Sequence, residues 1–287
     1  MPELPEVETV RHGLQTLICG FQVHEVEIYH ARSIRRNTGN CAAFREGLIG
    51  AKFSHFERRG KFLWIPIGQD RCLVTHLGMS GQVLVRKLAQ SPERCERIKI
   101  ILHKGRKTLE VRFVDQRLFG GMFLDDLIQG PLGGCVPKAI LHIAPDPLES
   151  VFDLDKVVST IQRRSAGIKS LILNQQILSG IGNIYADEAL WLSRIHYLSP
   201  GSSLSGPKIK KLIQDAQKIL VEAVRQGGTS FDQQYKNVNG ESGYFSNSLN
   251  AYGQAGFPCA RCGSKIKREA WSNRGSHFCP RCQRLKH

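Results

Sequence analysis

The sequence predicts an α+β multidomain protein with a β-sandwich domain, a helical domain and a small four-cysteine ribbon. An amphipathic helix opens the chain, and short apolar runs of strand length follow it. The apolar period then becomes helical, and two Cys-x-x-Cys pairs lie near the C-terminus. With 287 residues, 41% of them hydrophobic, the chain is long enough for separate cores. We therefore expect domains at 1–130, 151–248 and 249–287, with a linker at 131–150.

The first helix begins beside Pro2 and is expected to end near Gly20. A proline at the first helical position, with acidic residues in the first turn, is what helix capping alone favours. Removal of Met1 would instead leave Pro2 as a secondary amine flanked by Glu3 and Glu6. An α-amino group has a reference pKa near ~8, so at neutral pH it is unprotonated far more often than lysine. Such an amine is ready to attack an electrophilic carbon.

The next hundred residues favour strands, because short apolar runs alternate there with Gly, Asp and Lys. Several short strands with turn signals are typical of a sandwich or barrel. Gly and Pro are then concentrated between Gln129 and Pro147, where we place the domain boundary. The expected strands are 24–29, 62–67, 72–74, 82–85, 99–102 and 108–113.

Beyond the boundary, helices are expected at 154–163, 168–178 and 184–192, and a longer amphipathic helix runs from Pro207 to Gly227. The turn Gly180-Ile181-Gly182-Asn183 precedes the third helix. Asn183 is a natural N-cap there, and capping alone explains the asparagine. The two glycines favour close approach of a ligand, so the neighbouring N–H groups are also a candidate phosphate site.

Nine cysteines require an explanation in a chain whose acidic N-terminus lacks an apolar signal region. We expect an intracellular protein with reduced thiols. Cys259-x-x-Cys262 and Cys279-x-x-Cys282, sixteen residues apart, have the spacing of a zinc ribbon. Four protein ligands leave no open position, so the expected role of one zinc ion is structural. The remaining thiols are scattered and expected to be inert: Cys19, Cys41, Cys72, Cys95 and Cys135.

The charge of the chain indicates a polyanionic partner. Forty Lys and Arg residues against 25 Asp and Glu give a net charge of +15, which points first to nucleic acid. Anionic membranes are the rival partner, but no apolar run approaches the ~18 residues of a spanning helix. No basic amphipathic helix stands out either, so no membrane partner is expected.

Two basic regions are candidates for phosphate contacts. The ribbon sequence predicts a β-hairpin with Arg274 near its tip. A lone exposed arginine is usually only solvated, but on a metal-braced hairpin Arg274 becomes a candidate phosphate clamp. Arg58, Arg59 and Lys61 form the second region, for which surface solubility is the competing interpretation.

Five motifs occur along the chain in a fixed order. They are Pro2-Glu3-Leu4-Pro5-Glu6-Val7-Glu8-Thr9, Gly60-Lys61 before an apolar strand, His76-Leu77-Gly78-Met79-Ser80-Gly81, Gly180-Ile181-Gly182-Asn183-Ile184-Tyr185-Ala186 and the four-cysteine ribbon. In this order they resemble the motifs of bacterial formamidopyrimidine-DNA glycosylases, and the resemblance covers nearly the whole chain. It implies a catalytic domain at 1–130 and a helix-two-turn-helix DNA-binding domain at 151–248. The implied enzyme is cytoplasmic and nucleoid-associated, removes 8-oxoguanine and formamidopyrimidines from double-stranded DNA, and then nicks the backbone as an AP lyase.

The resemblance also implies roles for individual residues. Pro2 would attack C1′ of the damaged nucleotide, displace the base and form an iminium, after which β,δ-elimination cuts both sides of the sugar. Glu3 would shuttle protons and Glu6 would support the terminus, and two carboxylates beside one amine suit general acid–base work. Lys61 and Arg274 complete the implied catalytic set. Phosphate contacts around the lesion fall on Lys61, His76, Asn183 and Arg274, and the implied DNA-binding residues also include Lys169 and Tyr185.

A glycosylase of this kind must also turn the base out of the stack and fill the gap. The family pattern assigns this to Met79, Arg117 and Phe119, and wedges of this kind offset a few kcal/mol of unstacking. Met79 and Phe119 could each be core residues instead, whereas Arg117 is harder to bury without a partner. Gln116 and Leu118 replace the proline and the basic residue of the commoner form Asp-Pro-Arg-Arg-Phe-Gly, which puts the rigidity of this loop in question. The segment 237–245 resembles the loop that closes over the extruded base.

Two alternative functions remain open. Endonuclease VIII, which acts on oxidised pyrimidines, shares the terminal proline, the glycine turn and the ribbon. Its opening usually reads Pro-Glu-Gly-Pro-Glu, so Leu4 favours the purine branch. A non-catalytic paralogue that binds damaged DNA is the second alternative, and the loss of Pro2 or Glu3 would mark it. A single DNA-binding cleft requires only one chain, so we expect a monomer.

Overall fold

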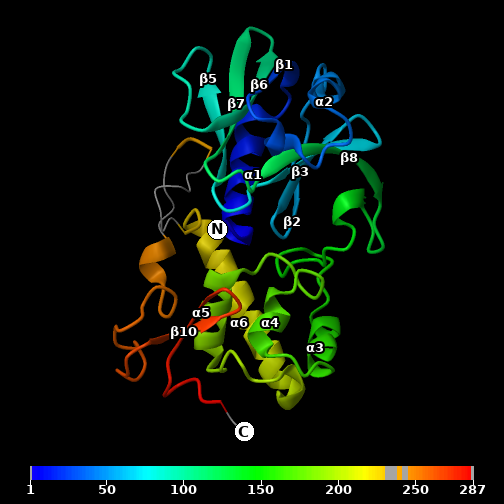
Figure 1. Ribbon diagram of the computed structural model, residues 1–287. Coiled ribbons are helices and arrows are strands. Elements are labelled where there is room, and N and C mark those ends of the chain that lie inside the picture. Colours follow the sequence, from blue (N-terminus) through cyan, green and yellow to red (C-terminus); the bar gives the residue numbers. More distant parts are fainter. Residues whose placement is uncertain (1, 230–237, 241–244, 286–287) are drawn as a thin grey trace. The chain divides into compact units, whose positions relative to one another are not determined.

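The computed structural model describes residues 2–229, 238–240 and 245–285, and the chain divides into two compact units (Figure 1). Unit 1 contains Met1–His142 and Gly227–Tyr244, and unit 2 contains Ile143–Gln226 and Phe245–His287. Most of the predicted helical range and the whole predicted ribbon range lie in unit 2, whereas Gly227–Tyr244 of the helical range belong to unit 1. The predicted ranges themselves stay a prediction.

Helix α1 (Leu4–Ile18) opens unit 1 and is held at its start by a capping box. The Glu3 side chain accepts the N–H of Glu6, and the Glu6 side chain accepts the N–H of Glu3. Pro2 therefore precedes the helix, and its interpretation as the first helical residue is wrong. Pro5 stands in the first turn instead. The predicted stop is confirmed, since α1 ends before Gly20, which has a φ of +83°.

Two antiparallel sheets make up the sandwich, in the strand orders β1-β6-β7-β5 and β2-β3-β4-β8-β9. The strands are β1 (Gln22–Ile28), β2 (Glu57–Arg59), β3 (Phe62–Ile67), β4 (Arg71–His76), β5 (Gly81–Lys87), β6 (Glu96–Lys104), β7 (Lys107–Asp115), β8 (Gly121–Gln129) and β9 (Cys135–Pro137). The six expected strands are confirmed as β1 and β3 to β7.

Strands β2, β8 and β9 and helix α2 (Cys41–Leu48) were missed. In β8, Asp125 and Asp126 interrupt the apolar run, so the local pattern gives little strand signal. Pairing with β4, in which Leu73 lies opposite Leu124, provides what that pattern lacks. Helix α2 is capped by the side chain of Asn40, which accepts the N–H of Ala43 at 3.0 Å.

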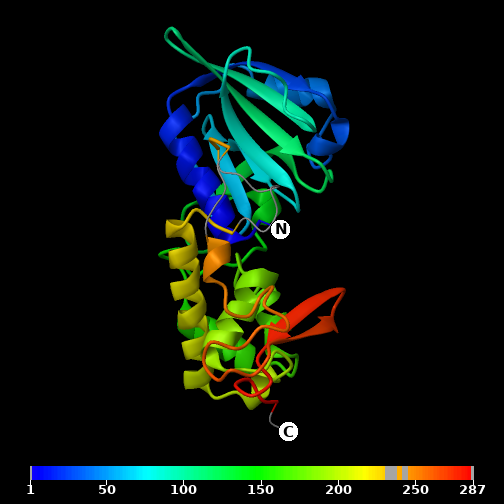
Figure 2. The same cartoon turned by 90° about the vertical axis from the view of Figure 1, so that its left-hand side faces the viewer.

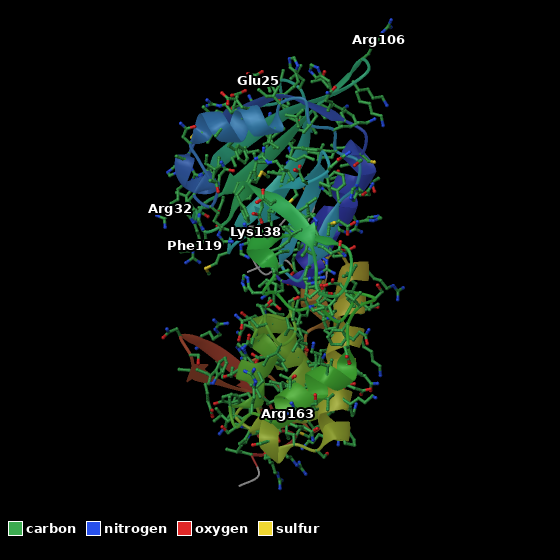
Figure 3. The ribbon with its side chains drawn as sticks, turned by 90° about the vertical axis from the view of Figure 1, so that its right-hand side faces the viewer. Glu25, Arg32, Arg106, Phe119, Lys138 and Arg163 are labelled. Carbon is green, nitrogen blue, oxygen red and sulfur yellow. The ribbon has the colours of Figure 1, made fainter. Side chains whose placement is uncertain are left out.

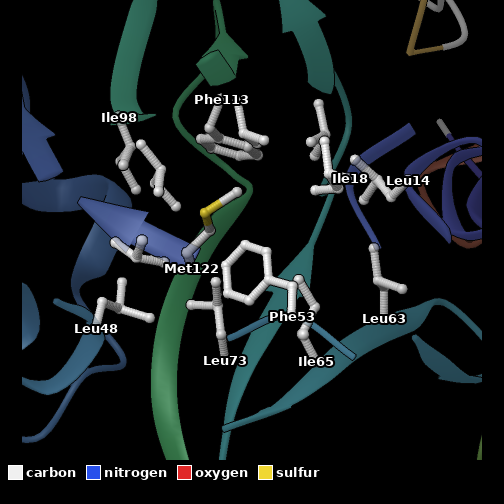
Figure 4. Close-up of a cluster of buried hydrophobic side chains, with 14 of the residues drawn as sticks. Leu14, Ile18, Leu48, Phe53, Leu63, Ile65, Leu73, Ile98, Phe113 and Met122 are labelled. Carbon is white, nitrogen blue, oxygen red and sulfur yellow. The ribbon is translucent and has the colours of Figure 1, made fainter. Parts of the chain in front are cut away.

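One apolar core joins α1 to both sheets (Figure 4). Leu14 and Ile18 of α1 contribute to it, together with Phe113 of β7 and Met122 of β8. All of these side chains are at most 3% exposed. Each such burial stabilises the fold by about 1.5–3 kcal/mol. The core therefore fixes α1, and with it the residues at its N-terminal end.

In its described residues, unit 2 contains four α-helices and a two-stranded hairpin that stands out from them (Figure 2). These elements are α3 (Leu154–Gln162), α4 (Ile168–Leu173), α5 (Asn183–Ser193), α6 (Gly206–Arg225), β10 (Lys267–Trp271) and β11 (Arg274–Phe278). All four expected helices are confirmed, although α4 ends at Leu173 rather than at residue 178.

Short 3-10 helices occur in both units, at η1 (Ala31–Ile34), η2 (Lys138–Ile140), η3 (Gly201–Ser203) and η4 (Phe245–Ser248). Within the described ranges, no helix has the length and apolar character needed to cross a membrane.

Candidate active site and DNA interface

The carboxylates that flank the predicted nucleophile are buried and held in place. Glu3 and Glu6 are each 1% exposed, and Pro2 is buried beside them. Glu6 Oε2 accepts the Glu3 N–H at 2.7 Å. Glu6 Oε1 accepts the N–H of Thr229 at 2.7 Å and its hydroxyl at 3.0 Å. Because the Glu3 N–H belongs to the peptide that joins Pro2 to Glu3, these bonds fix the backbone next to the predicted nucleophile.

Sequence reasoning missed Gly228 and Thr229 as parts of this site. Gly227 and Gly228 have φ values of +76° and +83°, a region that glycine enters without steric cost. A Cβ atom at Gly228 would lie 2.8 Å from Glu6 Oε1, so only glycine lets the backbone approach this carboxylate. Gly228 was the sequence signal for this part of the site. Gly227 alone is enough to end α6, so a second glycine after it indicates a further role.

The three predicted intercalating residues lie on two adjacent turns of unit 1. Met79 is 40% exposed and Phe119 is 43% exposed, so neither is a core residue (Figure 3 labels Phe119). The guanidinium carbon of Arg117 lies 5.2 Å from the centre of the Phe119 ring. A Cβ atom at Gly78 would lie 2.4 Å from the backbone nitrogen of Gly120. The turns thus pack backbone against backbone, and both present apolar side chains to solvent.

Asp115 braces the turn that carries Phe119, despite the absence of the proline found in the commoner motif. Its Oδ1 accepts the Ser80 hydroxyl at 2.5 Å and the Arg117 N–H at 3.1 Å. Its Oδ2 accepts the Gly120 N–H at 2.8 Å. Asp115 is completely buried, so little water competes for these bonds. These bonds hold the turn in place although Gln116 stands where the commoner motif has a proline.

His76 is a neutral hydrogen-bond donor in this structure. Burial and the nearby charges of Arg36, Lys61 and Arg35 lower its pKa to about 4. Its ring packs 4.7 Å from the ring of Phe62, and its Nδ1 accepts the Gly78 N–H at 3.2 Å. A neutral imidazole whose Nδ1 accepts a hydrogen bond carries its proton on Nε2. That N–H is suited to a phosphate oxygen, with the positive charge supplied by neighbouring residues.

In unit 2, Lys169 is fully buried and connects α4 to the ribbon hairpin. Its Nζ lies 2.6 Å from Asp187 Oδ1 and donates to the Gly275 carbonyl and the Ser276 hydroxyl. Asp187 Oδ2 accepts the N–H of His277 at 2.9 Å. These contacts place Lys169 directly behind the strand that begins at Arg274. A direct contact between Lys169 and DNA stays a prediction.

Asn183 also contacts the hairpin, and its predicted role as an N-cap is wrong. Gly182 is the N-cap of α5, and no side chain caps this helix. The Asn183 side-chain amide donates instead to the Gly275 carbonyl at 3.0 Å. If Asn183 were the N-cap, α5 would begin at Ile184. The helix begins at Asn183 instead, because the Asn183 side chain bonds to the distant Gly275 carbonyl rather than to its own helix.

The remaining predicted DNA contacts in unit 2 differ in exposure. Arg274 is exposed at the start of β11, after a turn in which Ser272 and Asn273 both have positive φ. This confirms the predicted hairpin, since two positive φ values are typical of a type I′ turn. Tyr185 is fully buried, and its ring centre lies 5.9 Å from that of Phe245. A direct contact between the Tyr185 side chain and DNA stays a prediction.

The four ribbon cysteines fit one zinc ion. Their Sγ atoms all lie within 4.8 Å of one another, and those of Cys262 and Cys279 are 3.4 Å apart. Four sulfurs at about 2.3 Å from a tetrahedral zinc lie about 3.8 Å from one another. Cys259 and Cys279 belong to a small buried cluster with Trp191 and Ile266. The metal would therefore hold the ribbon against α5.

The structure thus gathers the predicted site residues into local groups within each unit. Unit 1 contains the carboxylates near Pro2 and the group around His76 and Phe119. Unit 2 contains the group that joins α4, α5 and the hairpin. The predicted lesion loop at 237–245 falls mainly outside the described residues. Of its described part, the Val238 carbonyl accepts the Val85 N–H at 2.9 Å.

Three family models match consecutive parts of the chain. Formamidopyrimidine-DNA glycosylase N-terminal domain matches residues 1–122, and formamidopyrimidine-DNA glycosylase H2TH domain matches residues 143–234. A zinc finger found in FPG and IleRS matches residues 256–285.

Curated relatives match over the full length. A formamidopyrimidine-DNA glycosylase of Leifsonia xyli is 47% identical, and the match covers 99% of this chain and 100% of the relative. One from Rhodococcus jostii is 48% identical, with 99% and 96% covered.

Solved structures agree with these matches. A complex between the Lactococcus lactis Fpg and DNA containing an abasic site has a TM-score of 0.84 at 30% identity, with 98% of this chain and 99% of that chain covered. A complex of the wild-type Lactococcus lactis protein with DNA containing an oxidised pyrimidine has a TM-score of 0.84 at 30% identity, with 99% and 100% covered. The motifs, the fold and the full-length matches together show that this chain belongs to the formamidopyrimidine-DNA glycosylase family.

Proposed function

We propose that this chain is a base-excision repair glycosylase and AP lyase that removes oxidised purines from duplex DNA through Pro2. The main support for this proposal is the pair of buried carboxylates at the N-terminus. Glu6 accepts hydrogen bonds from the Glu3 N–H and from Thr229. The capping box accounts for the bonds between Glu3 and Glu6, but it requires neither the burial of both carboxylates nor the two bonds from Thr229 to Glu6. A nucleophilic amine, in contrast, needs groups nearby that accept and return protons.

After Met1 is removed, the Pro2 nitrogen attacks C1′ of the damaged nucleotide, and the bond from C1′ to the base breaks. The base leaves with a proton, and the sugar ring opens to give an iminium on Pro2. Loss of a C2′ proton then expels the 3′ phosphate, and a second elimination expels the 5′ phosphate. Glu3 moves protons in these steps, while Glu6 holds the backbone beside Pro2.

The DNA-binding surface of the proposal combines exposed wedge residues with hydrogen-bond donors for phosphates. Met79 and Phe119 are apolar and exposed beside Arg117, as residues that fill a gap in a base stack must be. Arg274 stands on a hairpin that zinc bound to the four cysteines would stabilise. The chemical steps use no metal, and the zinc ion would contribute only to folding.

The lesion class is proposed from Leu4 and from the relatives. Leu4 distinguishes this opening from the Pro-Glu-Gly-Pro-Glu of endonuclease VIII. Solved relatives are complexes with DNA containing Fapy-dG, with carbocyclic 8-oxo-G and with an oxidised pyrimidine. A test of this chain must therefore include both lesion classes. We further propose that the chain acts as a monomer in the bacterial cytoplasm, associated with the nucleoid through DNA.

Borohydride trapping followed by peptide mapping tests the proposal. The chain, with Met1 removed, is incubated with duplexes carrying 8-oxoguanine opposite cytosine or thymine glycol, and the adduct is mapped. We expect a covalent adduct at Pro2 with 8-oxoguanine. An adduct with thymine glycol alone would support the pyrimidine branch. Tight binding to both duplexes without any adduct would support the non-catalytic paralogue.

A further inference from the structure

Arg35 binds three consecutive carbonyls of the turn that carries Phe119. It follows the 3-10 helix η1, and its Nη2 donates to the Phe119 carbonyl at 2.8 Å. Its Nη1 lies 3.0 Å from the Gly120 carbonyl and 3.2 Å from that of Leu118. A planar guanidinium can reach several acceptors at once, which a lysine ammonium on its flexible stem cannot do with the same geometry.

This turn needs support because its backbone is strained at Leu118. Leu118 has a φ of +56°, which is uncommon for a residue other than glycine. Such a conformation persists when the surrounding contacts determine it. Asp115 accepts N–H groups of the turn, and Arg35 donates to its carbonyls. Asp115 and Arg35 together provide hydrogen-bond partners for N–H groups and for carbonyls of the turn, while the Phe119 ring remains exposed.

The neighbouring arginines do not share this role. Arg36 stacks near Phe62, with its guanidinium carbon 6.0 Å from the ring centre. Among the described residues, neither Arg36 nor Arg32 uses its side chain in a hydrogen bond or an ion pair. The three arginines carry the same charge within a few residues of one another, yet only Arg35 is bonded to the turn. Arg35 therefore bonds to the turn because of its place in the fold and not because the region is positively charged.

We propose that Arg35 is a positioning residue that holds Phe119 ready to enter the base stack. This inference rests on the proposed function, in which Phe119 fills the gap left by the extruded base. A turn already ordered in its binding conformation avoids the entropy cost of ordering it on DNA. Arg35, together with Asp115, thereby takes the place of the proline that this chain lacks at position 116.

The test compares Arg35→Gln, Arg35→Lys and the control Arg32→Gln, which removes one positive charge without touching the turn. Single-turnover rates are measured for excision of 8-oxoguanine from a duplex and for cleavage at a preformed abasic site, where no base has to leave the stack. We expect both Arg35 variants to excise about tenfold more slowly, with the abasic-site rate changed less than about threefold, because unstacking a base costs a few kcal/mol. The control should match the wild type in both assays.

Amide hydrogen exchange in the DNA-free protein provides an independent readout. We expect faster exchange at Arg117 and Gly120, whose N–H groups Asp115 holds, in both Arg35 variants and not in the Arg32 control. This result does not depend on catalysis, so it decides the positioning role even if the wild type does not excise 8-oxoguanine.

Three outcomes would overturn the proposal. Full rescue by Arg35→Lys would indicate a charge that binds phosphate. Equal loss of both rates would indicate a general folding defect, which thermal denaturation would confirm. Unchanged amide exchange would show that Arg35 does not order the turn.

Discussion

Thr229 donates two hydrogen bonds to the same oxygen of Glu6, one from its backbone N–H at 2.7 Å and one from its hydroxyl at 3.0 Å. The two residues are 223 positions apart. The other oxygen of the carboxylate accepts the Glu3 N–H at 2.7 Å. A segment near the end of unit 1 thus fixes the backbone beside Pro2, and Gly228 provides the space for it.

Replacing Gly228 with alanine should disturb the N-terminal site. The new Cβ would lie 2.8 Å from Glu6 Oε1, on a backbone with a φ of +83°. We expect a loss of stability of about 1–3 kcal/mol, typical of one strained residue, together with a clear loss of borohydride trapping. Gly68→Ala is the control, because Gly68 also has a positive φ but nothing within 4 Å of the new Cβ. If both variants trap DNA equally well, the Glu6 contact does not matter for catalysis.

Arg36 should contribute one phosphate contact, because His76 is neutral and cannot supply the charge itself. We expect Arg36→Gln to weaken binding to any duplex and to reduce the log–log salt slope by about 0.9. The measurement is a titration of affinity against salt concentration. Arg106→Gln is the control, since Arg106 lies at the end of unit 1 remote from Phe119 (Figure 3). An unchanged slope in Arg36→Gln would show that Arg36 is only solvated.

His76 should make stability depend on pH. Its pKa is about 4 in the folded protein, against an ordinary value of 6.5, so the unfolded chain binds more protons between these values. Stability should therefore fall as the pH is lowered from about 6.5 to about 4, and His76 should add no further loss below that. Denaturant unfolding at several pH values measures this slope. His76→Gln should flatten it, whereas His142→Gln, which removes an exposed imidazole, should not.

Removing zinc should expose Trp191. Its Nε1 donates to Cys259 Sγ at 3.4 Å, and the Arg261 guanidinium lies 4.0 Å from its ring centre. Structural zinc in small fingers contributes an apparent binding free energy of about 10–16 kcal/mol, so chelation should unfold the ribbon. Tryptophan emission should then shift to longer wavelength, and DNA affinity should fall because Arg274 and the Gly275 carbonyl lose their fixed positions.

Trp191→Phe is the control for this experiment. Trp64 is 3% exposed in unit 1 and should not respond to chelation, whereas Trp271 stands in β10 of the ribbon hairpin and should respond. Both proteins therefore carry Trp271→Phe, and in that background Trp191→Phe should abolish the emission shift. Complete zinc release with unchanged emission and unchanged DNA affinity would contradict both the contact and the role of Arg274.

Much of the fold was predictable because its signals are local. The apolar spacing from Leu4 to Ile18 predicts α1, and the run at 62–67 coincides with β3. The spacing of the four cysteines predicts a metal site whose sulfurs the structure brings together. Strand β8 was not predicted because Asp125 and Asp126 interrupt its apolar run, and only its pairing with β4 defines it as a strand.

The sequence by itself determined most of the helices and strands, the family motifs and the predicted zinc ligands, since each depends on residues a few positions apart. Tertiary structure decided which groups hold the site. Glu6 is bonded to Thr229, Asn183 to the Gly275 carbonyl, and Arg35 to the carbonyls near Phe119. The physical reason is that each of these bonds uses a backbone N–H or C=O, groups that nearly every residue carries. Residue identity therefore gives no signal for them, and only the folded chain brings the partners together.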